Sequence, residues 1–251
     1  MNNEWIGLWK KEWRMMRNFN IIFVICLVLW IAVMARNAFS LVDFVGLLVF
    51  GLIIMPATIL FSFNTESNQL QHFLHTVHSI HKQIIIKIVH GALLTISFYL
   101  ICSLSIYIFY LFHNDVMSSA LGLWDYLWFF CLSGLLYSFY PTAIVLVVWC
   151  LHQWFRHYVG WGLSALLLFG ILYLAASLFS AFKSLAIYTN LTSWGTFSLR
   201  SNGAEEIPFL VGDRTSNGLL FIDFGFILFY AVICVLLYFL SVYILNRKVE
   251  V

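Results

Sequence analysis

Six long apolar runs constrain what this chain can fold into. They cover residues 19–35, 42–63, 84–112, 126–149, 159–182 and 219–245. A soluble domain of this length cannot bury several separate runs of about twenty residues, so lipid is the expected solvent. The runs are continuous rather than alternating, and a helix satisfies its own backbone in lipid. The sequence therefore predicts an all-α, polytopic membrane bundle of six transmembrane helices.

The composition agrees with a membrane protein. Apolar residues make up 63% of the 251 residues and charged residues only 10%, whereas a soluble domain carries about 25% charge. The net charge of +2 is too small to indicate a nucleic-acid partner. The five cysteines show no paired spacing typical of disulfides or zinc sites. No repeat or linker divides the chain, so we expect a single transmembrane domain over residues 1–251.

The distribution of basic residues predicts the orientation. With the amino terminus inside, the inner segments hold nine Lys and Arg residues and the outer segments four. The positive-inside rule then places both termini in the cytoplasm, with a multi-pass chain in the plasma membrane. Two connections are longer than simple turns, namely the inner segment 64–83 and the outer segment 183–218, which is long enough to form short helices.

The first 17 residues form an amphipathic pattern. On a helix over residues 3–17, tryptophans gather on one side and cations on the other. The aromatic side carries Trp5, Trp9 and Trp13, and the cationic side carries Lys10, Lys11, Arg14 and Arg17. Indole rings favour the headgroup region and cations favour anionic lipid, so this pattern predicts an elbow helix at the membrane interface. A plain anchor with orienting charges is the alternative.

A second amphipathic pattern lies between the second and third runs. Over residues 69–81, apolar side chains fall within an arc of roughly 120°. Such a helix of about three turns suits a groove on a partner protein. The candidate docking residues are Leu70, His72, Phe73, Leu74, His75, Val77, His78 and His81.

The four histidines of this segment recur every third residue, which suggests a metal site. Steps of three lag an α-helix by about 60° each, so the first and last imidazoles point in opposite directions. No carboxylate or cysteine stands nearby at ligand spacing. We therefore favour a polar docking surface over a metal site.

Motifs for catalysis are weak. The chain has no Gly-rich phosphate loop ending in Gly-Lys-Ser/Thr, so any ATP is expected to be used by a partner. Glu205-Glu206 and Arg214 approach the Glu-Glu-x-x-x-Arg of intramembrane prenyl-protein proteases, but the arginine lies four residues too far on. The centres of the predicted helices carry no charged residue, which argues against an ion-coupled pump.

These features together resemble the membrane subunit of type-2 ABC transporters. The resemblance covers the full chain. It rests on the stretch from Leu8 to Arg14 running into the first span, on six spans with both termini inside, on the inner segment Glu66 to Lys87, and on the long outer connection before the last span. The usual small-residue and Pro-containing turn after the inner helix is replaced here by His78-Ser79-Ile80-His81.

The resemblance implies a function and a set of partners. In that family the inner helix docks in a cleft of a separate ATP-binding subunit, and two permease copies, alike or different, assemble with two such subunits. ATP and Mg²⁺ belong to the partner, and this chain needs no cofactor. The chain is similar to permeases of low-GC Gram-positive bacteria, so we expect export of an amphipathic or hydrophobic substrate such as a peptide or toxin.

Two other classes remain open on the sequence. One is a membrane-embedded, metal-dependent hydrolase or protease that uses the histidines from His72 to His81. The other is a membrane immunity protein that protects without transporting anything.

Overall fold

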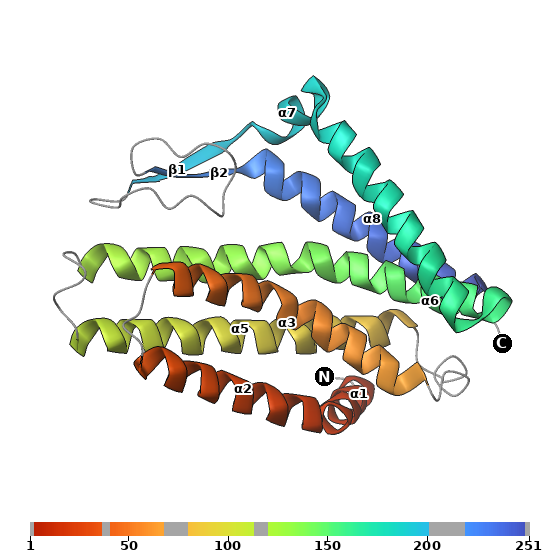
Figure 1. Ribbon diagram of the computed structural model, residues 1–251, viewed down its shortest axis with the longest axis horizontal. Coiled ribbons are helices and arrows are strands. Elements are labelled where there is room, and N and C mark those ends of the chain that lie inside the picture. The colour runs from red at the N-terminus through yellow and green to blue at the C-terminus, as the bar shows by residue number, and fades with distance from the viewer. Residues whose placement is uncertain (1–2, 37–40, 68–79, 113–119, 201–218, 249–251) are drawn as a thin grey trace. The chain divides into compact units, whose positions relative to one another are not determined.

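The computed structural model describes residues 3–36, 41–67, 80–112, 120–200 and 219–248. Most of them are helical (Figure 1). The elements are α1 (Asn3–Met15), α2 (Arg17–Arg36), α3 (Leu41–Ser67), α5 (Ile80–Phe112), α6 (Ala120–Lys183), α7 (Ala186–Thr192), β1 (Thr196–Arg200), β2 (Leu219–Asp223) and α8 (Phe224–Lys248). The predicted helical class is confirmed, and the structure adds one short two-stranded sheet.

Four described helices are long and apolar enough to cross a membrane, with windows in α3, α5, α6 and α8. Helices α1 and α2 form a pair bent by 58°, which adds a fifth span if the pair is counted as one. The structure thus supports a membrane protein. Six spans remain a prediction, which requires α6 to cross twice.

The chain divides into two compact units, Met1–Val145 and Leu146–Glu250. In the first unit, α3 and α5 run alongside each other (Figure 1). Helix α3 buries Met55, Ile59 and Phe63, whose spacing of four residues places them on one helical face. Gly91 of α5 lies against this face, because a Cβ atom at Gly91 would be 3.2 Å from Cγ of Met55.

A buried tyrosine joins three helices of the first unit. The ring of Tyr99 in α5 lies between Gly51 of α3 and Gly134 of α6. A Cβ atom on either glycine would lie 2.5 Å from Cζ of the tyrosine, with Cε1 facing one glycine and Cε2 the other. Small residues let membrane helices approach closely. Here the two missing side chains make the space for one ring.

The long helix α6 is interrupted at Gly160, where φ is 78° and ψ is 176°. Beyond the break the chain turns back, since Oγ of Ser164 lies 2.9 Å from Nδ1 of His152. Twelve residues of straight helix would separate these positions by about 18 Å. Residues 150–158, between the fourth and fifth apolar runs, are helical, and the turn is concentrated at one glycine.

The second unit also corrects the start of the last predicted span. Residues 219–223 form β2, which pairs antiparallel with β1 in the register Thr196↔Asp223 to Arg200↔Leu219, and α8 begins only at Phe224. Aromatic rings hold α6 and α7 near α8: the rings of Phe182 in α6 and Tyr188 in α7 lie 6.2 Å and 5.6 Å from the ring of Phe229 in α8. The outer segment thus contains the short helix α7 and strand β1 within its described part.

Gly134→Ala should destabilise the first unit by about 1–3 kcal/mol, because the added methyl overpacks a ring that Gly51 prevents from retreating. Thermal unfolding of the purified chain in detergent measures the change. Gly170→Ala is the matched control, since nothing lies within 4 Å of a Cβ there. An equal response of the two variants would contradict the tyrosine contact.

Gly160→Ala should cost about 1–3 kcal/mol in the same unfolding measurement, because an L-residue rarely adopts these backbone angles. Gly162→Ala, two residues on and also in open space, should instead be neutral or slightly stabilising, since alanine favours a helix by up to about 1 kcal/mol. Equal stability of the Gly160→Ala and Gly162→Ala variants would contradict the left-handed backbone conformation at Gly160.

Candidate functional site

The site starts from a lysine in an apolar stretch. Lys87 follows three isoleucines in α5 and precedes Ile88, and its side chain is only 2% exposed. A buried ammonium costs several kcal/mol unless it is paired and hydrogen-bonded. Its partners must therefore come from neighbouring helices.

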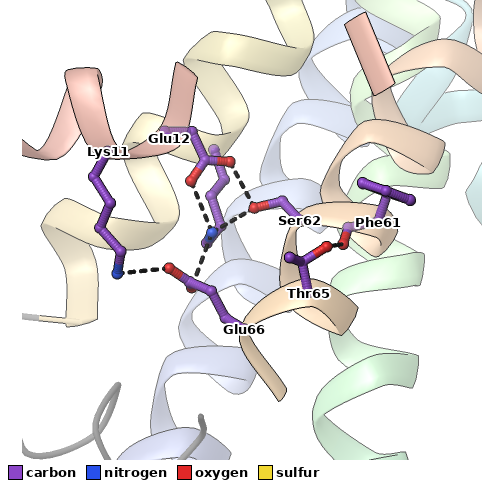
Figure 2. A network of polar contacts seen from close by, with 7 residues as sticks. Lys11, Glu12, Phe61, Ser62, Thr65 and Glu66 are labelled. Carbon is purple, nitrogen blue, oxygen red and sulfur yellow. Dashed lines mark hydrogen bonds and ion pairs between the residues drawn. The ribbon is translucent and has the colours of Figure 1, made fainter. Parts of the chain in front are cut away.

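Two other helices supply those partners. Nζ of Lys87 lies 3.0 Å from Oε2 of Glu12 in α1 and 3.0 Å from Oε2 of Glu66 in α3. It also donates a hydrogen bond to Oγ of Ser62 in α3. Ser62 in turn donates to Oε1 of Glu12 at 2.6 Å (Figure 2). Three oxygen atoms thus surround the ammonium: those of Glu12 and Ser62 accept hydrogen bonds, whereas Oε2 of Glu66 makes an ion pair without a hydrogen bond.

A fourth charge balances the cluster. Nζ of Lys11, from α1, lies 2.8 Å from Oε1 of Glu66 (Figure 2). Two ammonium groups therefore face two carboxylates, and the group of ions is neutral as a whole. The ring of Phe63 covers Lys87 at 5.2 Å from Nζ, which adds a cation–π contact. We call Lys11, Glu12, Ser62, Glu66 and Lys87 the ion cluster.

The ion cluster joins the last residues of α3 to the first turns of α5. Glu66 is one residue from the end of α3, and Lys87 is in the second turn of α5. A second ion pair joins Lys82 of α5 to Glu4 of α1 at 2.8 Å, and both side chains are at least one-third exposed. Residues that precede 68–79 in the sequence and residues that follow them therefore both make charged contacts with α1.

An aromatic layer continues the contact one turn along α5. His90 is buried, and its ring lies 5.7 Å from Trp9 and 5.4 Å from Trp13, both of α1. Nε2 of His90 lies 3.3 Å from Oδ1 of Asn20 in α2. The layer thus ties the bend between α1 and α2 to α5.

The structure distributes the predicted elbow residues differently from the sequence pattern. Helix α1 forms over the predicted range, but its buried stripe is Leu8 and Glu12, continued by Met16. Trp13 is 51% exposed, and Trp5 and Trp9 are half-buried. Lys10, Arg14 and Arg17 are exposed, while Lys11 belongs to the ion cluster. The interfacial position of this helix stays a prediction.

Most of the predicted docking residues lie outside the described residues: Leu70, His72, Phe73, Leu74, His75, Val77 and His78. His81 is described, and it stands in the first turn of α5 rather than at the end of a separate helix. Among the described residues, no three or more His, Cys, Asp or Glu side chains are grouped to hold a metal ion. The metal hypothesis for the whole histidine series therefore stays open.

Sequence reasoning missed the roles of Glu12, Ser62, Glu66 and His90, and it used Lys87 only as a marker of the span end. A signal was present. Glu12 is the only acidic residue between Lys10 and Arg17, and it stands four residues from both Leu8 and Met16. An acid in the middle of an apolar stripe predicts a buried partner.

The chemistry of the ion cluster favours a structural role, in which it holds helices together, over a catalytic role. Each carboxylate oxygen of Glu12 and Glu66 lies next to a donor, and Ser62 both accepts and donates. Opening such a cluster exposes unpaired charge in a poorly solvated place, which is costly. We therefore interpret it as a tie among α1, α3 and α5.

Lys87→Met should destabilise the first unit by about 3–5 kcal/mol, because it leaves buried carboxylates without their counter-ion. Adding Glu12→Gln restores charge balance, so the double variant should be more stable than the sum of the single effects. Thermal unfolding in detergent measures the cycle. Lys82→Met, which opens the exposed pair, should cost about 1 kcal/mol or less. Additive effects of Lys87→Met and Glu12→Gln would contradict the cluster.

Comparisons with known proteins do not assign this chain to a family: no family model matches it, and no curated protein or solved structure matches it significantly.

Proposed function

We propose that this chain is the membrane subunit of an ATP-driven exporter, moved by a separate ATP-binding subunit that docks on residues 69–81. The main support for the proposal is the ion cluster, which joins the ends of the two helices that flank this segment. It supports a role in which a push on the segment reaches several membrane helices together.

Both helices that flank the segment are ion-paired with α1. Residues 68–79 join α3, which ends at Ser67, to α5, which begins at Ile80. Lys87 links Glu66 near the first end to Glu12 of α1, and Lys82 links the second end to Glu4 of α1. A displacement of the segment is therefore opposed at both ends by the same helix.

The stiffness of this tie follows from its burial. Moving α3 away from α5 separates Glu66 from Lys87, which are both at most 10% exposed, and water is not at hand to replace the lost partner. The three helices are thus expected to move as one body rather than one at a time. Rigid-body motion of helices against one another is a common way to open a path through a membrane protein.

In the proposed cycle, two ATP-binding subunits close on ATP and Mg²⁺ and push the docking segments of two permease copies. The helices that the ion cluster holds together then tilt and admit an amphipathic or hydrophobic substrate, of which a peptide or toxin is the expected kind. The orientation proposed from the basic residues places the docking segment in the cytoplasm of a bacterium.

The first experiment is purification of the tagged chain from its native membrane in mild detergent. An ATP-binding subunit should co-purify, and the complex should hydrolyse ATP. Recovery of the intact chain without such a subunit would contradict the proposal and favour a membrane immunity protein.

Phe73→Glu or Leu74→Glu should uncouple ATP hydrolysis from export, because each places a charge on the apolar side of the predicted docking helix. Export and ATP hydrolysis are measured in parallel in proteoliposomes that contain the complete complex. Gln71→Glu, on the polar side, is the matched control and should keep both activities. Full coupling in the Phe73 and Leu74 variants would refute the docking role.

A further inference from the structure

The basic side chains around α1 fall into two groups. Lys11, Lys82 and Lys87 are paired with carboxylates of the described residues. Lys10, Arg14 and Arg17 are exposed. None of these three has an ion pair or hydrogen bond with any residue that the structure describes.

Two of these cations, Lys10 and Arg14, share one side of α1, and the third follows directly after the bend into α2. At 100° per residue, Lys10 and Arg14 stand nearly opposite the buried stripe of Leu8 and Glu12. Arg17 opens α2 directly after the 58° bend. Trp13 and Ile6 are the apolar members of this side, 51% and 37% exposed. We call Ile6, Lys10, Trp13, Arg14 and Arg17 the basic face.

We propose that the basic face binds the headgroups of anionic phospholipids, and that this binding holds α1 in the position that the ion cluster requires. Three cations without partners among the described residues match a negatively charged surface. An exposed indole and an isoleucine interleaved with them are typical of a helix that lies in the headgroup region. An acidic protein surface could pair with the cations. It would not provide apolar contacts for the exposed parts of Trp13 and Ile6.

The two sides of α1 are linked by the helix itself. Glu12 enters the ion cluster on one side, and the lipid would hold the opposite side. A ligand that binds only the folded arrangement stabilises it by mass action. Anionic lipid should therefore raise the stability of the first unit, and this expectation does not depend on the transporter proposal.

The experiment uses the purified full chain in detergent, titrated with phosphatidylglycerol or with phosphatidylcholine, and follows the unfolding temperature. Wild type should be stabilised by phosphatidylglycerol and much less by phosphatidylcholine. The triple variant Lys10→Gln, Arg14→Gln, Arg17→Gln should bind phosphatidylglycerol roughly 100-fold more weakly, since each cation near an anionic surface contributes about fivefold. Raising the salt concentration should reduce the wild-type response.

Two controls separate this effect from general loss of charge. Lys11→Gln breaks the pair with Glu66 and should lower stability in both lipids, yet keep the response to phosphatidylglycerol. Arg156→Gln removes an exposed cation from the second unit and should also keep the response.

Three outcomes would overturn the inference. The first is a triple variant that responds to phosphatidylglycerol like wild type. The second is equal stabilisation of wild type by soluble glycerol phosphate, which would assign the face to free phosphate groups. The third is an acidic protein that the triple variant loses while its lipid response is unchanged. None of these outcomes bears on co-purification of an ATP-binding subunit, so the two proposals fail separately.

Discussion

The buried ammonium of Lys87 is the constraint on which the arrangement of α1, α3 and α5 depends. A cation that is 2% exposed destabilises the fold unless carboxylates reach it. Glu66 comes from the neighbouring helix, but Glu12 lies 75 residues away in the sequence. The need to pair Lys87 therefore accounts for why α1 packs against α5, although α1 leads directly into α2.

This constraint also gives α1 two distinct sides. The side with Leu8 and Glu12 is buried, and the side with Lys10 and Arg14 is exposed. An uncharged apolar stripe would also pack against α5, but it would tolerate sliding, whereas charged hydrogen bonds have preferred distances and directions. The ion cluster thus defines one position of α1 along α5. The proposed exporter would require such a defined position in order to transmit force from residues 69–81.

Close helix contacts complete the first unit by a different physical means. Lipid provides little hydrophobic drive for one apolar helix to leave it for another, so packing and polar contacts decide the pairing. Gly51 and Gly134 provide such packing around Tyr99, and Lys87 provides the polar contact. In the second unit, Gly160 instead supplies a reversal of direction, using backbone angles that other residues rarely adopt.

The sequence alone determined the helical character and the approximate helix bounds, because long apolar runs in lipid have few alternatives to a helix. It could not place β2, since the apolar residues 219–222 suit a strand and a span equally well. Nor could it show the break at Gly160, because glycine permits that conformation without requiring it. The spacing of Lys10 and Arg14 placed both on the cationic side of α1, and the structure leaves both exposed. Only the tertiary structure decided that Glu12 meets Lys87, because pairing between distant charges depends on how the helices fold back on one another and leaves no periodic pattern in the sequence.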